Sequence, residues 1–117
     1  MSTLKVDTIQ DTNAVEMYLC KAWVNFNGSG TVAIRASGNV TSITDNGTGD
    51  YTMNFTNAMT DADYSVCGTT QENRTIGVAY GYVGSPLTTT SARVVTTLTN
   101  GSYTVSDPSG VFISVFS

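Results

Sequence analysis

Residues 21–56 read KAWVNFNGSGTVAIRASGNVTSITDNGTGDYTMNFT. Apolar and polar residues alternate in short segments of this stretch, and Gly, Asn and Asp interrupt the alternation about every ten residues. A period of two places successive side chains on opposite faces of a strand, and these three residue types favour tight turns. The stretch therefore predicts consecutive antiparallel strands joined by hairpins.

The same pattern continues to the C-terminus. Asn100-Gly101 is a strong signal for a two-residue hairpin turn, and residues 107–110, DPSG, fit a type I turn. We expect about eight or nine strands with short connections, typical of an all-β fold of the antiparallel β-sandwich or jelly-roll-like class. Residues 20–117 are expected to form this single β-sandwich domain.

Residues 1–19 have a different character. The segment LKVDTI, which contains Leu4, Val6 and Ile9, is a weak strand at most, and the polar residues after it show no sustained 3.6-residue period. We therefore expect an extended N-terminal arm.

Composition excludes several classes of protein. The net charge is −4, and the five Lys and Arg residues are scattered singly, so no basic stripe is present to bind the phosphates of a nucleic acid. No long apolar run predicts membrane insertion or a signal peptide, so we expect synthesis in a cytoplasm. Cys20 and Cys67 are too few for a disulfide framework and are expected to behave as small apolar residues, and the sequence leaves open whether they are bonded.

No catalytic constellation is present. The chain has no histidine, which excludes nucleophilic triads that rely on that base. Carboxylate pairs occur at Asp61 with Asp63 and at Asp45 with Asp50, but both lie in turn sequences, where Asp usually hydrogen-bonds nearby backbone amides. We therefore expect no enzyme activity, no cofactor and no metal site.

Residues 21–66, KAWVNFNGSGTVAIRASGNVTSITDNGTGDYTMNFTNAMTDADYSV, closely resemble a module of the tail-fibre and related surface proteins of tailed bacteriophages. The opening STLKVDTIQ also resembles the start of phage virion components. The resemblance implies a virion structural protein of tail-fibre type, a homotrimer on the outer surface of the particle. It also implies that the arm, with Leu4, Val6 and Ile9, docks to other virion proteins.

Two surfaces are candidates for contacts. The last strand has Val111, Ile113 and Val115 on one face and Phe112 and Phe116 on the other, so the phenylalanines are the candidate oligomer interface. A polar tip followed by tyrosines is the candidate recognition tip for a host surface glycan, although such tyrosines more often lie in a core or a subunit interface. Its residues are Gln71, Asn73, Arg74, Tyr80 and Tyr82.

Trp23 has the same ambiguity, and a packing anchor is the favoured interpretation over a ligand platform. Two other functions stay open. One is a capsid decoration (cement) or head-fibre protein, and the other is a carbohydrate-binding module without a role in a virion.

Overall fold

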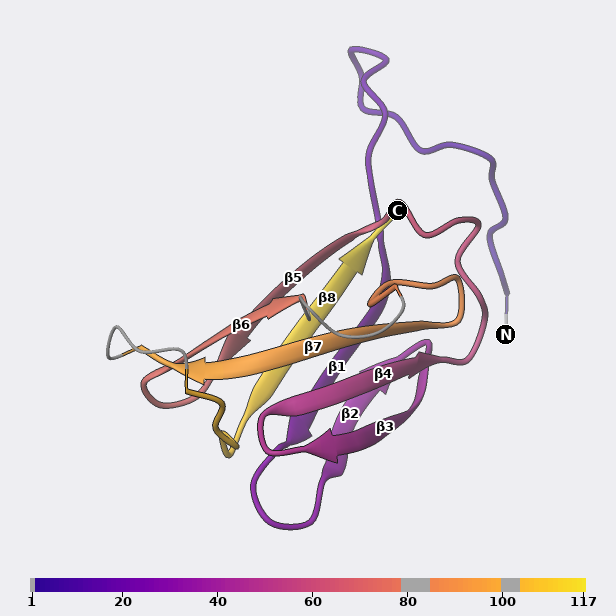
Figure 1. Ribbon diagram of the computed structural model, residues 1–117. Coiled ribbons are helices and arrows are strands. Elements are labelled where there is room, and N and C mark those ends of the chain that lie inside the picture. The colour runs from indigo at the N-terminus through magenta and orange to yellow at the C-terminus, as the bar shows by residue number, and fades with distance from the viewer. Residues whose placement is uncertain (1, 79–84, 100–103) are drawn as a thin grey trace.

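The computed structural model describes residues 2–78, 85–99 and 104–117, and these residues form eight strands and no helix (Figure 1). Alternating segments become strands because one face of each is packed and the other is left to solvent or to polar contacts. The strands are β1 (Cys20–Asn27), β2 (Ala33–Gly38), β3 (Val40–Gly47), β4 (Asp50–Phe55), β5 (Ser65–Thr70), β6 (Arg74–Val78), β7 (Ser91–Leu98) and β8 (Val111–Phe116).

The strands pair in two antiparallel sheets of four. One sheet has the order β2-β1-β8-β5 and the other has the order β3-β4-β7-β6. The pairs β1–β2, β3–β4 and β6–β7 join neighbours in sequence, whereas β8 lies between β1 and β5. The predicted all-β antiparallel sandwich is therefore confirmed, with a strand number inside the expected range.

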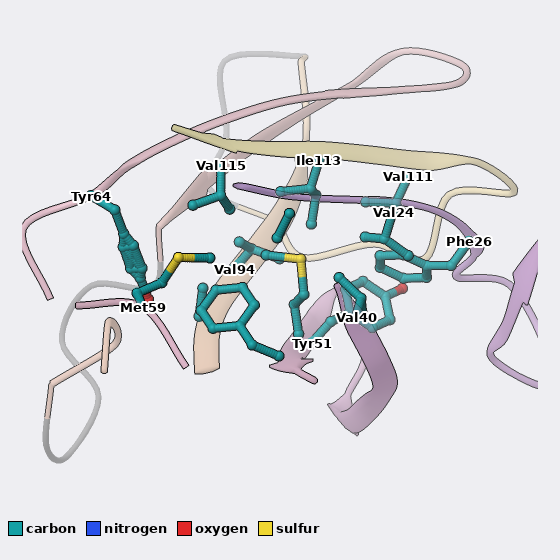
Figure 2. Close-up of a cluster of buried hydrophobic side chains, with 14 residues drawn as sticks. Val24, Phe26, Val40, Tyr51, Met59, Tyr64, Val94, Val111, Ile113 and Val115 are labelled. Carbon is teal, nitrogen blue, oxygen red and sulfur yellow. The ribbon is translucent and has the colours of Figure 1, made fainter. Parts of the chain in front are cut away.

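The core lies between the sheets (Figure 2). Val24 and Phe26 of β1 and Val111, Ile113 and Val115 of β8 point from one sheet toward the other. The facing sheet contributes the following buried residues: Val40, Tyr51, Met53, Phe55, Ala92 and Val94. The rings of Phe26 and Tyr51 meet edge to face, with centroids 5.2 Å apart. The alternation predicted these faces correctly because every second residue of a strand shares one environment.

Two expected boundaries were wrong. The turn residues 45–49, DNGTG, predict a break of five residues, but the observed break is shorter, because β3 continues to Gly47 and only Thr48 and Gly49 connect it to β4. Gly49 has a φ of 64°, the left-handed conformation that a turn this tight requires. The polar residues 69–75 predict a longer tip than the one observed, since β5 and β6 leave only residues 71–73 between them. Asn100-Gly101 lies outside the described residues.

Residues 2–19 contribute no strand to either sheet, in agreement with the predicted arm. Figure 1 shows the arm leaving β1 close to the end of β8 and extending beyond the sandwich. The arm turns back on itself at an isolated bridge between Gln10 and Glu16, where the amide of Met17 donates to the carbonyl of Ile9 at 2.7 Å.

Candidate binding surfaces

A shallow groove lies on the outer face of the β2-β1-β8-β5 sheet. We call it the aromatic groove and define it by Trp23, Cys67, Phe112, Ser114 and Phe116, which line it. Its volume is about 560 Å³. These side chains point away from the core, because they alternate along their strands with the buried residues of the sandwich.

Strand register places Ser114 at the centre of the groove. Ser114 of β8 pairs with Trp23 of β1 on one side and with Cys67 of β5 on the other. Phe112 and Phe116 lie two residues before and after Ser114 on the same face of β8. Trp23 is therefore a diagonal neighbour of both phenylalanines, at a spacing within reach of aromatic side chains. Three aromatic side chains surround a small hydroxyl residue.

The indole of Trp23 lies across the neighbouring strand. It covers Gly38, its register partner on β2, so closely that a Cβ atom at Gly38 would stand 2.8 Å from Cδ1 of the indole. Trp23 is nevertheless 43% exposed. Trp23 is therefore packed on the outer face of β1, where its place in the alternation puts it, and not in the core between the sheets.

Polar groups complete the groove. Asn25 and Thr69 line it on either side of Phe112, and Asn25 Oδ1 accepts a hydrogen bond from Nη1 of Arg35 at 3.3 Å. The other guanidinium nitrogen, Nη2, donates to the carbonyl of Ser109. Among the described residues that line the groove there is no Asp, Glu, Lys or Arg. The surface thus combines rings, hydroxyls and one amide.

The two cysteines are free, and both are exposed at the groove. They lie outside the core, since Cys20 begins β1 and Cys67 faces outward on β5. The strand β8 lies between β1 and β5, which separates the two backbones by about two interstrand spacings, or roughly 10 Å. A disulfide needs Cα atoms within about 7 Å, so the two thiols do not reach each other inside one chain.

The polar tip is held by the chain itself. The Gln71 amide donates to the carbonyl of Gly110 at 2.9 Å, and the Arg74 Nε donates to Oγ of Ser106 at 2.7 Å. The carbonyl of Asn73 accepts from the Arg74 side chain. These contacts tie the tip to residues 106–110 and give Arg74 a structural partner. The other two residues of the predicted recognition tip, Tyr80 and Tyr82, lie outside the described residues.

Glu72, inside the same tip, has a left-handed backbone with a φ of 67°. Its carboxylate accepts a hydrogen bond from Oγ of Ser109 at 2.7 Å and lies 3.5 Å from the guanidinium of Arg74. The Ser109 hydrogen bond, aided by the charge of Arg74, lowers the pKa of Glu72. The tip is thus a self-contained polar cluster.

The candidate docking residues of the arm are exposed. Leu4 is 83% exposed, Val6 53% and Ile9 38%. Other large apolar side chains of the arm are also more than half exposed: Val15, Met17, Tyr18 and Leu19. The two legs of the arm, residues 4–9 and 16–19, border an open gap of about 370 Å³. The structure brings the predicted docking residues together along this gap.

The acidic residues serve the backbone, as predicted. Oδ1 of Asp61 accepts from the amide of Asp63 at 2.9 Å, and Oδ1 of Asp45 accepts from the amide of Gly47 at 3.1 Å. Asp50 instead forms a two-bond ion pair with Arg93. In residues 2–78, 85–99 and 104–117, no cluster of three or more His, Cys, Asp or Glu side chains could hold a metal ion.

The sequence predicted the outward faces of single strands that line the aromatic groove, but not that these faces lie side by side. The alternation of residues 21–26 puts Trp23 on the face opposite to Val24 and Phe26, and that of the last strand puts Phe112 and Phe116 opposite to its buried residues; the structure confirms both. The missing information was that β8 pairs with β1, strands separated by more than 80 residues of sequence. The common signal is a large aromatic residue at an outward position of an otherwise polar face.

Comparison of the chain with protein-family models, curated proteins and solved structures gives no match. Among the described residues there is no helix long and apolar enough to span a membrane.

Proposed function

We propose that this chain is a non-catalytic structural protein of a bacteriophage virion, of the tail-fibre type. It docks on the particle through residues 2–19 and assembles as a homotrimer on the outer surface. The proposal rests on the resemblance of residues 21–66 to tail-fibre modules and on one structural observation, the apolar arm.

The arm supports docking because it leaves many apolar groups in water. A contiguous set of large exposed apolar side chains is unusual on a soluble monomer and marks a contact surface. Leu4, Val6, Met17 and Leu19 border one gap between the two legs of the arm. An extended segment of another chain fits such a gap by strand addition.

Association of copies has a physical motive of its own. The sandwich ends in the four edge strands β2, β5, β3 and β6, and an open edge is stabilised when another chain pairs with it. A spare apolar face is stabilised in the same way, and the face of β8 with Phe112 and Phe116 is the expected contact; both lie on the outer face of the sheet, where Phe116 is 38% exposed. Their part in an oligomer stays a prediction.

The test of the proposal compares two matched triple variants by light scattering and circular dichroism. In the first, Leu4, Val6 and Ile9 are replaced by serine. In the second, the exposed polar residues Thr3, Thr8 and Thr12 of the same arm are replaced by serine. The full chain and the threonine variant are expected at three times the 12.3 kDa chain mass. The apolar variant is expected to be a folded trimer as well, but to be lost from purified particles in which the threonine variant is retained, because the arm is proposed to dock to other virion proteins and not to join the copies. A full chain that is monomeric at micromolar concentration contradicts the trimer.

A capsid decoration or head-fibre protein is the second candidate, since an apolar arm serves a capsid site equally well. Electron microscopy of purified particles labelled with an antibody to this chain separates the two. Label on the tail supports the tail-fibre proposal, and label spread over the head supports the decoration protein.

A further inference from the structure

We infer that the aromatic groove is a binding site for a neutral saccharide, held by stacking on Trp23, Phe112 and Phe116 and by hydrogen bonds to Asn25, Thr69 and Ser114. This inference shares Phe112 and Phe116 with the candidate oligomer interface, so it requires that the copies of a trimer meet through other residues. It concerns a different surface from the arm and can hold for a monomer as well as for a trimer.

The chemistry of the lining selects the class of ligand. Small-molecule sites combine aromatic surface with a few placed polar groups that fix orientation. A sugar ring has the matching pattern, with apolar C–H faces that pack on rings and hydroxyl groups around its edge. In the groove, Ser114 lies among the three aromatic side chains, and Asn25 and Thr69 lie on either side of Phe112.

The charge of the lining makes the ligand neutral. No carboxylate, ammonium or guanidinium group lines the groove among the described residues. Arg35, which touches the rim through Asn25, directs its guanidinium to that amide and to the carbonyl of Ser109. A charged ligand would lose hydration without gaining a counter-charge, and that loss is costly. A neutral ligand avoids this cost.

The size of the groove favours a small ligand over a second copy of the chain. Its volume of about 560 Å³ lies within the range of roughly 300 to 1,000 Å³ that is usual for small-molecule sites. Stable protein interfaces use about 20 to 30 residues on each side. Eleven residues of the described chain line the groove. The groove is thus about half as large as such an interface needs.

The groove is also preorganised. Trp23 is fixed over Gly38. Only glycine, which has no Cβ atom, leaves room for the indole at this position. The ring therefore does not have to be ordered when a ligand binds, and the entropy cost of fixing it has been met by folding.

The test titrates the full chain with maltohexaose, cellohexaose, mannohexaose and chitohexaose, with acidic 3′-sialyllactose as the charged comparison. Trp23 is the only tryptophan, so its fluorescence reports on the groove alone. Alkylation of Cys67 by iodoacetamide, followed by peptide mass spectrometry, is the second readout, because this exposed thiol lines the groove. At least one neutral hexasaccharide is expected to change the emission saturably and to slow Cys67 alkylation about fivefold or more.

Variants locate the binding to the groove, with calorimetry as the measurement. Trp23→Ala is expected to weaken the best saccharide about tenfold or more, and Thr69→Val, which keeps the size and removes the hydroxyl, about threefold or more. Tyr18→Ala is the matched control, since Tyr18 is an exposed aromatic residue of the arm that does not line the groove. It is expected to bind as tightly as the unaltered chain. Unchanged thermal melting by circular dichroism shows that each variant is folded.

Three results would overturn the inference. One is that no neutral hexasaccharide changes either readout at millimolar concentration. The second is that 3′-sialyllactose binds as tightly as the best neutral sugar, or that Tyr18→Ala loses as much affinity as Trp23→Ala. The third is that Cys67 is protected in the absence of sugar and Trp23→Ala converts an oligomer to a monomer, since the groove is then an interface between copies.

Discussion

The indole of Trp23 lies over the α-carbon of Gly38 on the neighbouring strand, in the space that a Cβ atom would occupy. This contact fixes an exposed tryptophan on the outer face of a sheet. It connects an edge strand, β2, to the rim of the aromatic groove.

Replacing Gly38 by Ala is expected to displace the Trp23 indole. The new Cβ would stand 2.8 Å from Cδ1, closer than real Cβ contacts come, so the ring must move away from β2. We expect a shift of the fluorescence maximum to longer wavelength, with a change in the free energy of unfolding below about 1 kcal/mol because the site is at the surface. Gly77→Ala is the control, since a Cβ there meets nothing within 4 Å. Identical emission spectra for Gly38→Ala and the unaltered chain would refute the contact.

Tyr51 is expected to make stability fall at high pH. Its hydroxyl donates to the carbonyl of Gly28 at 3.0 Å and to Oδ1 of Asp107 at 2.8 Å. Burial, together with the hydrogen bond to Asp107 and its charge, raises the pKa of Tyr51. Above the ordinary tyrosine pKa of about 10 the unfolded chain loses this proton while the folded chain keeps it, so the free energy of unfolding decreases as pH rises.

Tyr51→Phe should reduce this dependence in urea unfolding followed between pH 8 and pH 11. At neutral pH the free energy of unfolding of the variant is expected to be lower by about 1 to 2 kcal/mol, because the carbonyl of Gly28 and the carboxylate of Asp107 lose the hydroxyl donor. Part of the alkaline slope remains, since burial also raises the pKa of Tyr64. Tyr18→Phe, in the exposed arm, serves as control and should follow the unaltered chain. A Tyr51→Phe curve with the full alkaline slope would contradict the assignment.

Arg93→Ala is expected to destabilise the sandwich on the order of 3 kcal/mol. The guanidinium of Arg93 binds Asp50 through Nε to Oδ1 at 2.9 Å and through Nη2 to Oδ2 at 2.6 Å. Asp50 is only 6% exposed, so the substitution removes the guanidinium partner of a buried carboxylate. The stability of Arg93→Lys should lie between that of the unaltered chain and that of Arg93→Ala, because an ammonium group keeps the charge but cannot form the two parallel hydrogen bonds to the carboxylate.

Urea unfolding at pH 7 measures the Arg93 effect, with Arg35→Ala as the control at an exposed position of β2. The control substitution is expected to lower the free energy of unfolding by less than about 1 kcal/mol. If Arg93→Ala and Arg35→Ala unfold at the same urea concentration, the ion pair of Arg93 with Asp50 does not stabilise the fold more than the contacts of an exposed arginine do.

Oxidation is expected to give no disulfide within one chain. Cys20 and Cys67 are free, exposed and separated by β8. Treatment with diamide, followed by non-reducing electrophoresis and mass spectrometry, should show only cross-linked chains and unmodified monomer. Cys67→Ser should still cross-link through Cys20. A monomer that has lost two hydrogens would show that the sheet opens far enough for the thiols to meet.

Much of the fold was predictable because the signals are local. In residues 51–55, the alternation of Tyr51, Met53 and Phe55 with polar neighbours identified the buried face of β4 before any partner strand was known. The same reasoning separated Val111, Ile113 and Val115 from the phenylalanines on β8. A side-chain period of two depends only on the geometry of the strand itself.

The candidate groove was not predictable in the same way. Trp23, Cys67 and Phe112 belong to three strands, and nothing in their local sequence specifies that β8 lies between β1 and β5. The tip gives the opposite case, since Arg74 was expected to face a ligand and instead donates to Ser106, a residue 32 positions later. Both outcomes depend on long-range pairing.

The sequence by itself determined the strands, most of their turns, the faces that are buried and the arm that is left out of the sheets. Only the tertiary structure decided which outward faces lie together, where Trp23 rests and how far apart the two thiols stand. The reason is that alternation and turn residues act over a few neighbouring positions, whereas the order of strands in a sheet is selected by the packing of the whole core.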